Sequence, residues 1–280
     1  MARKVLLISD EDYSPECVGG AAANNVELIK ILRGKDYDVR FVLTAQFNIS
    51  FPVLESADLY IVSNFYFISE EAKQFLYSRK YIIIEHDYKF AITRNPCLYK
   101  DLIVPPEHKV HEEFYKKAQL VIVQSALQKS VFDKNIALSN IVNFSGNLWS
   151  VETLDFIKSL RSEQKNGKAC ILGSDDCGIK GRDVAIDFCK RTFLKYDLLP
   201  QLPHHDFLSR LSAYSTYVFF PQTPETLSRV CIEARLLNLS VITGQYTGAV
   251  HEEFYNLEST EIFQYLLRKR DVIWNLIDSA

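Results

Sequence analysis

The chain has 280 residues, of which 48% are hydrophobic and 24% are charged, and its formal net charge at pH 7 is -3. This length and composition fit a folded protein of one large or two small domains, whose core is large enough to need no disulfides. The slightly acidic balance argues against a dedicated nucleic-acid-binding protein, although residues 73–134 carry a local excess of Lys and Arg over Asp and Glu.

The cysteines and the N-terminal residues bear on the compartment. The six cysteines form no CxxC pair and do not lie near His at zinc-ligand spacing, so we expect reduced thiols in the core. The first apolar run, residues 5–8, is too short for the hydrophobic part of a signal peptide. No stretch approaches the roughly 20 apolar residues of a membrane span. We therefore expect a cytoplasmic protein without a membrane span.

Short apolar runs recur along the chain and are near-continuous in Val, Ile, Leu and Phe rather than alternating. This pattern is typical of strands that are buried on both faces of a parallel sheet. Helical patterns fill the gaps, and the alternation predicts an α/β doubly wound fold. The predicted strands cover residues 5–8, 39–43, 59–62, 81–84, 120–123, 141–144, 169–172, 217–220 and 241–242, and the predicted helices cover residues 21–32, 70–77, 111–118, 125–132, 151–160, 182–191, 206–211, 229–237, 261–267 and 271–277.

A polar segment over residues 161–168, which contains Gly167, is typical of a linker. It predicts a first Rossmann-like domain over residues 1–163 and a second over residues 164–260. We expect a C-terminal helix within residues 261–280 to complete the first domain.

Two glycines, Gly19 and Gly20, stand between the first predicted strand and a predicted helix. Glycines at such a turn let the backbone approach a ligand, and the N-terminus of a helix favours an anion. The spacing is not the G-x-G-x-x-G of dinucleotide-binding proteins, and an ordinary strand-to-helix turn explains the two residues equally well.

The segment 224–234 carries two glutamates, Glu225 and Glu233, in an E-x7-E pattern. Glu225 precedes a predicted helix and Glu233 lies within it. Free backbone N–H groups at the start of that helix can hold a diphosphate. A carboxylate one turn further on can accept hydrogen bonds from a pair of ribose hydroxyls. Two solvated glutamates near a helix start are the simpler alternative.

In their order and spacing, these features resemble the large retaining GT-B glycosyltransferase group often called family four. The resemblance runs from residue 4 to about residue 250 and rests on the first strand with its Gly-Gly loop, on segments 120–125 and 224–234, and on the Lys-Gly segment 171–183. It implies two Rossmann-like domains that face across a cleft, the second one small. It also implies a hexosyl- or pentosyltransferase that uses a UDP-sugar or a GDP-sugar without a metal ion or other cofactor.

The resemblance assigns the donor side of the site. Lys180 would neutralise the diphosphate and Glu233 would bind the ribose. Glu225 and the backbone N–H groups of Leu227 and Ser228 would lie beside the sugar and the phosphates.

The resemblance also places Gly19 and Gly20 on the opposite wall of the cleft. One departure concerns the diphosphate, because the group usually has an Arg where this chain has Ser174. Arg182 and Arg229 are the candidates to replace the missing cation. This departure and the short second domain leave open a catalytically inactive protein that only binds a nucleotide.

The strand over residues 81–84 is followed by Glu85, His86 and Asp87. Ligands in open α/β sheets bind beyond the carboxyl ends of the strands, and similar transferases place a His here next to the sugar. We therefore predict that His86 acts in catalysis together with Lys180 and Glu225. Whether His86 takes part in the chemistry or only shapes the pocket stays open.

The predicted acceptor side consists of Asp87, Tyr88, Lys89 and Arg94, which follow His86. Basic residues among aromatic ones can contact phosphates and a base taken out of the stack, or a glycan. In its small size and its frequent use of Lys, Ile, Asn, Tyr and Phe, the chain resembles bacteriophage transferases. Some of these transferases modify hydroxymethylated pyrimidines in DNA. Such a protein would work in the host cytoplasm. A transferase for cell-surface glycans is the alternative, and the oligomeric state stays open.

Two acidic clusters have the form of metal ligands. Asp10 and Asp12 match the D-x-D of metal-dependent transferases with a different fold, and Asp175 and Asp176 form a second cluster. Loop carboxylates are more often solvated, so no metal is predicted. The sequence offers no carboxylate pair of the glycosidase kind. The resemblance implies retention without a protein nucleophile, so the leaving phosphate is expected to take the proton of the acceptor.

Overall fold

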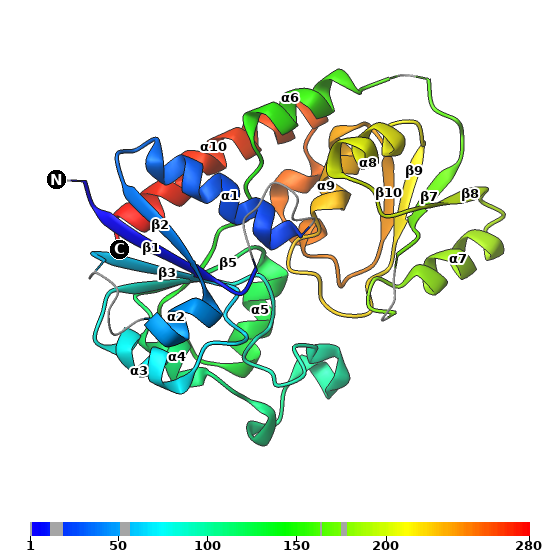
Figure 1. Ribbon diagram of the computed structural model, residues 1–280. Coiled ribbons are helices and arrows are strands. Elements are labelled where there is room, and N and C mark those ends of the chain that lie inside the picture. The colour runs from blue at the N-terminus through cyan, green and yellow to red at the C-terminus, as the bar shows by residue number, and fades with distance from the viewer. Residues whose placement is uncertain (1, 12–18, 51–56, 163, 175–177) are drawn as a thin grey trace. The chain divides into compact units, whose positions relative to one another are not determined.

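The first part of the chain builds a parallel six-stranded sheet with strand order β2-β1-β3-β4-β5-β6. The computed structural model describes residues 2–11, 19–50, 57–162, 164–174 and 178–280. Figure 1 shows the strands of this sheet side by side. The strands are β1 (Lys4–Ser9), β2 (Asp38–Leu43), β3 (Leu59–Ser63), β4 (Tyr81–Ile84), β5 (Leu120–Val123) and β6 (Ile141–Asn143).

The direction of winding reverses between β1 and β3. The chain passes from β1 to β2 on one side and then returns to place β3 on the other side of β1. All residues of β3 and β4 are buried, which explains their continuous apolar sequences. In open α/β sheets, ligands bind beyond the carboxyl ends of the strands at such a reversal.

Helices connect these strands. They are α1 (Gly20–Arg33), α2 (Thr44–Ser50), α3 (Glu70–Tyr77), α4 (Glu112–Lys117) and α5 (Ala126–Asn135), with short 3-10 turns at Pro96–Leu98, Lys100–Leu102 and Pro106–His108. Helix α3 begins after Ser69, whose side chain accepts a hydrogen bond from the N–H of Ala72. One core cluster joins Val5 and Leu7 of β1 to Leu28 of α1.

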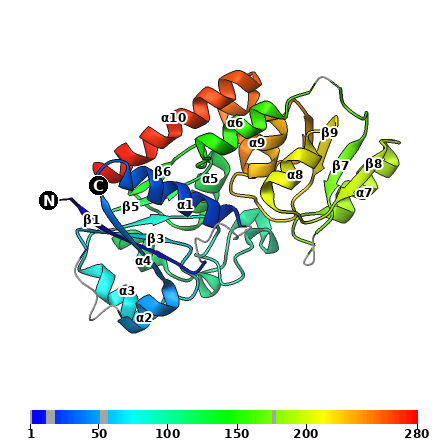
Figure 2. The ribbon, with the colours of Figure 1, turned by 45° about the horizontal axis from the view of Figure 1, so that its top comes forward.

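The second part of the chain builds a parallel sheet with strand order β10-β9-β7-β8, which Figure 2 shows from another side. Its strands are β7 (Ala169–Leu172), β8 (Tyr196–Leu199), β9 (Thr216–Phe219) and β10 (Ser240–Thr243). Its helices are α6 (Val151–Ser159), α7 (Arg182–Arg191), α8 (His204–Leu211) and α9 (Arg229–Leu236), followed by 3-10 turns at Gly248–His251 and Glu253–Asn256.

The chain divides into two compact units that differ at their edges from the expected domains. The first unit comprises residues 1–124, 129–148 and 268–280, and the second comprises residues 125–128 and 149–267. Helix α6 was expected in the first domain, but it belongs to the second because Leu154 and Ile157 pack in that unit's core. The last helix is one continuous element, α10 (Ser259–Asp278), rather than two.

Helix α10 carries residues of both units. Within the first unit, Arg270 of α10 donates to the buried Glu27 of α1 at 2.9 Å, and Lys269 donates to the carbonyl oxygen of Phe144. Ile273 and Ile277 complete the core around β1. In the part of the chain that the structure describes, no helix combines the length and the apolar composition that crossing a membrane requires.

Candidate functional site

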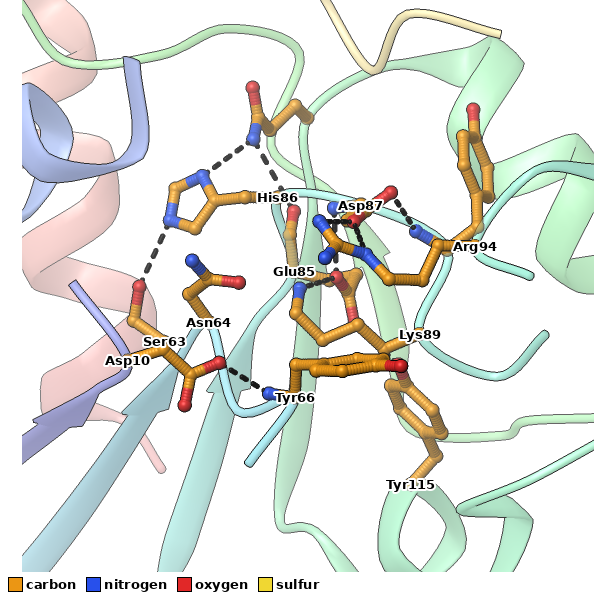
Figure 3. Close-up of polar contacts among 12 residues, drawn as sticks. Asp10, Ser63, Asn64, Tyr66, Glu85, His86, Asp87, Lys89, Arg94 and Tyr115 are labelled. Carbon is orange, nitrogen blue, oxygen red and sulfur yellow. Dashed lines mark hydrogen bonds and ion pairs between the residues drawn. The ribbon is translucent and has the colours of Figure 1, made fainter. Parts of the chain in front are cut away.

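The first unit gathers polar side chains where its central strands end. Ser9 ends β1, Ser63 ends β3, and His86 and Gln124 follow β4 and β5. His86 Nε2 lies 3.0 Å from the Ser63 hydroxyl, and its Nδ1 lies 2.8 Å from the amide nitrogen of Gln124. Figure 3 shows the ring of His86 at this edge of the sheet. The reversal of winding between β1 and β3 therefore brings the predicted His86 to the edge where a ligand is expected.

Two of the predicted acceptor residues are instead part of the core. Tyr88 and Lys89 are each only 1% exposed. Lys89 makes a 2.6 Å ion pair with Glu85, which also accepts a hydrogen bond from Tyr115 (Figure 3). Burial raises the pKa of Glu85, while the charge of Lys89 and the two hydrogen bonds oppose this shift. The prediction that Tyr88 and Lys89 contact an acceptor is corrected, because neither side chain reaches the surface.

Asp87 and Arg94, the other two predicted acceptor residues, lie at the surface and form an ion pair with each other. The guanidinium of Arg94 stands over the ring of Tyr66, 5.2 Å from its centre. Tyr66 and its neighbour Phe67 are both exposed. These two aromatic residues follow β3, and the sequence analysis missed them because they belong to no motif.

Asp10 holds the turn that carries these aromatic residues. Its carboxylate accepts the N–H of Tyr66 at 2.5 Å and that of Phe67 at 3.4 Å. Burial raises the pKa of Asp10, while these hydrogen bonds and the charge of Lys89 oppose the shift. Asp10 therefore has a role in the turn, whereas Asp12, Asp175 and Asp176 lie outside the described residues. Among the residues that the structure describes, no group of His, Cys, Asp and Glu could hold a metal ion.

Gly19 and Gly20 lie at the start of α1, as the N-cap and the first residue. A Cβ atom added at Gly19 would stand 3.1 Å from a carboxylate oxygen of Glu11. The glycine thus allows Glu11 to approach the backbone at the helix start.

In the second unit, the Lys-Gly turn lies close to the strand β9. Gly181 has φ +67°, and a Cβ atom there would stand 1.8 Å from the carbonyl oxygen of Phe220. Only glycine combines this backbone conformation with this close approach. The turn places Lys180 beside Glu225, and the two side chains form an ion pair. The loops after β7 and β9, where this sheet reverses its winding, thus bring together Lys180 and Glu225 of the donor-side prediction.

Glu225 is fixed through its backbone. Its N–H donates to the carbonyl oxygen of Tyr246 at 2.7 Å, and its own carbonyl oxygen accepts from the N–H of Gly248 at 2.9 Å. Leu227 is buried and Ser228, with φ +72°, precedes the first residue of α9. The first N–H groups of a helix have no partner within it, so this loop presents donors near the Lys180 and Glu225 pair.

We expect Gly248→Ala to disturb this loop. The added Cβ atom would stand 2.3 Å from the carbonyl oxygen of Thr226 and 2.6 Å from the hydroxyl of Ser125. We expect a loss of about 1–3 kcal/mol in the free energy of unfolding, as for other overpacked sites. Urea unfolding measures it, and Gly244→Ala is the control, because its Cβ atom would meet only the ring of Phe220 at 3.6 Å. Equal stabilities of the two variants would contradict this reading.

Glu233 is buried rather than open to a ligand. Its side chain is 1% exposed, and one carboxylate oxygen accepts from Trp149 at 2.9 Å and lies 3.0 Å from His204. Arg229 lies 3.9 Å from the same oxygen and stands over the ring of Trp149. Burial acts to raise the pKa of Glu233, but the charges of His204 and Arg229 and the hydrogen bonds outweigh it and lower the pKa to about 2.

This lowered pKa predicts a stability that depends on pH. The charged Glu233 stabilises the folded chain above pH 4.5, its ordinary pKa, and the contribution disappears as the pH falls towards 2. We expect Glu233→Gln to lose about 3 kcal/mol near neutral pH, from a shift of two to three units. Urea unfolding between pH 6 and pH 3 should show the difference between the variant and the parent shrink. A difference that does not change with pH would contradict this prediction.

The two candidate cations of the donor side both have partners. Arg182 donates to the carbonyl oxygen of Gly173 at 3.0 Å and pairs with Asp183 at 3.3 Å. Arg229 is held by Trp149 and Glu233. Arg182 thus stands at the end of β7, next to Ser174, where the resembled group has its Arg.

Sequence comparison and structural comparison give different results. No protein-family model matches the chain, and no curated protein sequence matches it. Solved structures, in contrast, match over nearly the whole chain. The structure of HepE from Anabaena in complex with UDP and glucose is 15% identical, with a TM-score of 0.54, and the match covers 95% of this chain and 89% of that one.

Two further structures match with similar scores. An α-glucosyltransferase in complex with UDP and a 13-mer DNA containing a HMU base is 10% identical, with a TM-score of 0.55 and coverage of 97% of this chain and 94% of that one. AviGT4, a glycosyltransferase involved in avilamycin A biosynthesis, is 10% identical, with a TM-score of 0.54 and coverage of 99% and 96%. The chain therefore has the GT-B fold that its sequence predicted, with two Rossmann-like parallel-sheet domains, the second built on the smaller sheet.

Proposed function

We propose that this chain is a retaining glycosyltransferase that moves a sugar from a UDP-sugar to a hydroxyl group of an acceptor. The observation that carries the proposal is the Lys180–Glu225 pair at the reversal of the second sheet, beside the start of α9. Structures of similar fold hold UDP or UDP with glucose, which favours UDP over GDP as the nucleotide of the donor.

On the donor side, Lys180 and the N–H groups of Leu227 and Ser228 stabilise the diphosphate as it leaves. Charge that develops on a leaving group is stabilised most by donors that are already in place, and the backbone bonds of Glu225 fix this loop. Arg182, at the end of β7, supplies the second positive charge in place of the Arg that the resembled group has at the position of Ser174. No metal ion is needed in this scheme.

The buried position of Glu233 changes its proposed role. Because its side chain is 1% exposed, Glu233 acts on the ribose through the groups that it holds rather than by direct contact. His204 is the best placed of these, since 43% of its side chain is exposed and Glu233 orients its ring. We therefore propose that His204 meets the donor and that Glu233 positions it.

For the chemical step, we propose that the leaving phosphate takes the proton of the acceptor hydroxyl. Glu225 holds the hydroxyls of the transferred sugar, while His86 shapes the carboxyl edge of the first sheet and takes no part in the proton transfer. The orientation of the reactants and the fixed charges then supply most of the rate enhancement.

On the acceptor side, we propose a hydroxymethylated pyrimidine in DNA, or a sugar attached to it. Tyr66 and Phe67 are exposed aromatic rings on which an extruded base can stack, and Arg94 can reach a phosphate. The α-glucosyltransferase of similar fold is bound to DNA with a HMU base. The alternative acceptor, a cell-surface glycan, would use the same aromatic faces to stack on sugar rings.

The test is nucleoside-diphosphate release from UDP-, GDP- and ADP-sugars, with and without DNA that contains 5-hydroxymethylcytosine. We expect release from UDP-sugars that this DNA accelerates and unmodified DNA does not. Release that glycans accelerate instead would replace the DNA acceptor by the alternative. No release from any donor would overturn the proposal in favour of an inactive nucleotide-binding protein.

A further inference from the structure

The side chain of His86 is part of a chain of hydrogen bonds that runs across the carboxyl ends of the strands in the first unit. The Asn147 amide donates to Gln124 at 3.2 Å, and the Gln124 amide nitrogen lies 2.8 Å from His86 Nδ1. His86 Nε2 lies 3.0 Å from the Ser63 hydroxyl, which donates to Asn25 at 2.8 Å. The side chains of these partners are buried, whereas the His86 ring itself is half-buried.

Backbone groups fix the direction of this chain. The N–H of Leu148 donates to the side-chain oxygen of Asn147 at 2.8 Å, and an N–H can only donate. The nitrogen of Asn147 must then face the oxygen of Gln124. The nitrogen of Gln124 points towards His86 and also towards the carbonyl oxygen of Glu85, at 3.4 Å, which can only accept. If the Gln124 amide were flipped, its nitrogen would face the nitrogen of Asn147, and its oxygen would face the carbonyl oxygen of Glu85. Neither contact would then be a hydrogen bond.

The fixed direction determines where His86 carries its proton. An amide N–H can only donate, so the His86 Nδ1 that faces Gln124 must accept and has no proton. A neutral imidazole then carries its proton on Nε2, which donates it to the Ser63 hydroxyl. The hydroxyl in turn donates a hydrogen bond to the amide oxygen of Asn25, and the amide nitrogen of Asn25 donates to Ser9 at 3.3 Å.

We propose that Gln124 is a positioning residue that holds His86 neutral, with the proton on Nε2. In this state the Nδ1 lone pair is already used, so His86 is not the base that takes the acceptor proton. The catalytic consequence rests on the proposed function. Positive charge develops on the sugar as the donor bond breaks, and a neutral His86 adds no charge that repels it.

The test of the proton position is a long-range proton–nitrogen NMR correlation on the full-length chain with ¹⁵N-labelled histidine at pH 7. His86→Asn identifies the His86 signals by their loss. We expect one unprotonated nitrogen, Nδ1, and a protonated Nε2. A proton on Nδ1, alone or together with one on Nε2, would overturn the inference.

Gln124→Glu tests the cause. The new carboxylate accepts a hydrogen bond where the amide donates one, so we expect Nδ1 of His86 to become protonated. The spectrum of His86 should then be that of a doubly protonated ring. Gln119→Glu is the matched control, because Gln119 is exposed just before the same strand β5. An unchanged His86 spectrum in Gln124→Glu, or the same change in the control, would contradict the role of Gln124.

Ser63→Ala provides a second route if Gln124→Glu does not fold. It removes the acceptor of the Nε2 proton, together with the donor to Asn25, and leaves the Gln124 contact of Nδ1 in place. We therefore expect the Nε2 proton to exchange faster with water while Nδ1 stays unprotonated. Unchanged exchange would contradict the direction of the chain of hydrogen bonds.

Measurements of kcat and KM distinguish a positioning role of Gln124 from a purely structural one. For Gln124→Glu we expect kcat to fall about tenfold, the effect of one lost interaction in the transition state, with an unchanged KM for the donor. The NMR result needs neither donor nor acceptor. A neutral His86 in a chain without transfer activity would therefore count against the proposed function only, whereas a protonated His86 in an active chain would count against this inference only.

Discussion

Replacing Lys180 by methionine is expected to lower kcat/KM for sugar transfer by about a hundred- to a thousandfold, the usual effect of removing one fixed group that stabilises a developing charge. Methionine keeps much of the length of the side chain and removes its charge. The Lys-Gly turn should stay intact, because Gly181 and its contact with Phe220 are unchanged. Nucleoside-diphosphate release at several donor concentrations measures the effect.

Two companion variants make this result specific. Lys190→Met removes an exposed charge from α7 and should keep full activity. Glu225→Gln removes the partner of Lys180, so free UDP should bind more tightly while transfer is lost, because the sugar loses its carboxylate. A Lys180→Met chain whose kcat/KM falls by less than about tenfold, a change of only about 1.4 kcal/mol, would contradict the assignment.

Replacing Lys89 by methionine is expected to lower the free energy of unfolding by about 3–5 kcal/mol, because it leaves a buried carboxylate without its partner. Lys89 and Glu85 both have fully buried side chains and lie 2.6 Å apart. The turn after β4 should be destabilised as well, because Glu85 also accepts the N–H of Asp87 at 2.8 Å. Urea unfolding of the full-length chain measures the loss.

The double variant Glu85→Gln with Lys89→Met separates charge from packing. Without the carboxylate, the methionine no longer faces an uncompensated charge, and we expect much of the lost stability to return. Lys80→Met, at an exposed position before β4, should change stability by less than about 0.5 kcal/mol. A Lys89→Met chain as stable as the Lys80→Met control would show that the buried pair has no energetic role.

The parallel sheets could be predicted because their central strands are continuous apolar runs. The strand β8 was missed since it lies at the edge of its sheet, where Leu198 is exposed and the pattern is broken. The helix α2 was missed because its seven residues are too short to show a helical period. The single helix α10 was expected as two pieces, because the charged residues 268–271 interrupt its apolar pattern.

The candidate site could be predicted only where a motif carries it. Lys180 and Glu225 were assigned through the resemblance to the GT-B group, and the structure brings these two side chains together. Tyr88 and Lys89 were misassigned because a basic or aromatic residue in a loop suggests exposure, and sequence does not show that Glu85 draws Lys89 inside.

Partners that lie far apart in the sequence gave no signal at all. Trp149 and His204 reach Glu233 from 84 and 29 residues away, and Gln124 reaches His86 from 38 residues away. Only the folded sheets make these residues neighbours.

The most direct test of the central claim is the mass of an acceptor after incubation with UDP-glucose and the purified chain. An oligonucleotide with 5-hydroxymethylcytosine and a set of glycans serve as acceptors, with the Lys180→Met chain as the control. We predict that one acceptor gains the mass of a hexose residue while an equal amount of UDP is released, and that the control shows neither. No mass gain and no release with any acceptor or nucleotide sugar would contradict the account.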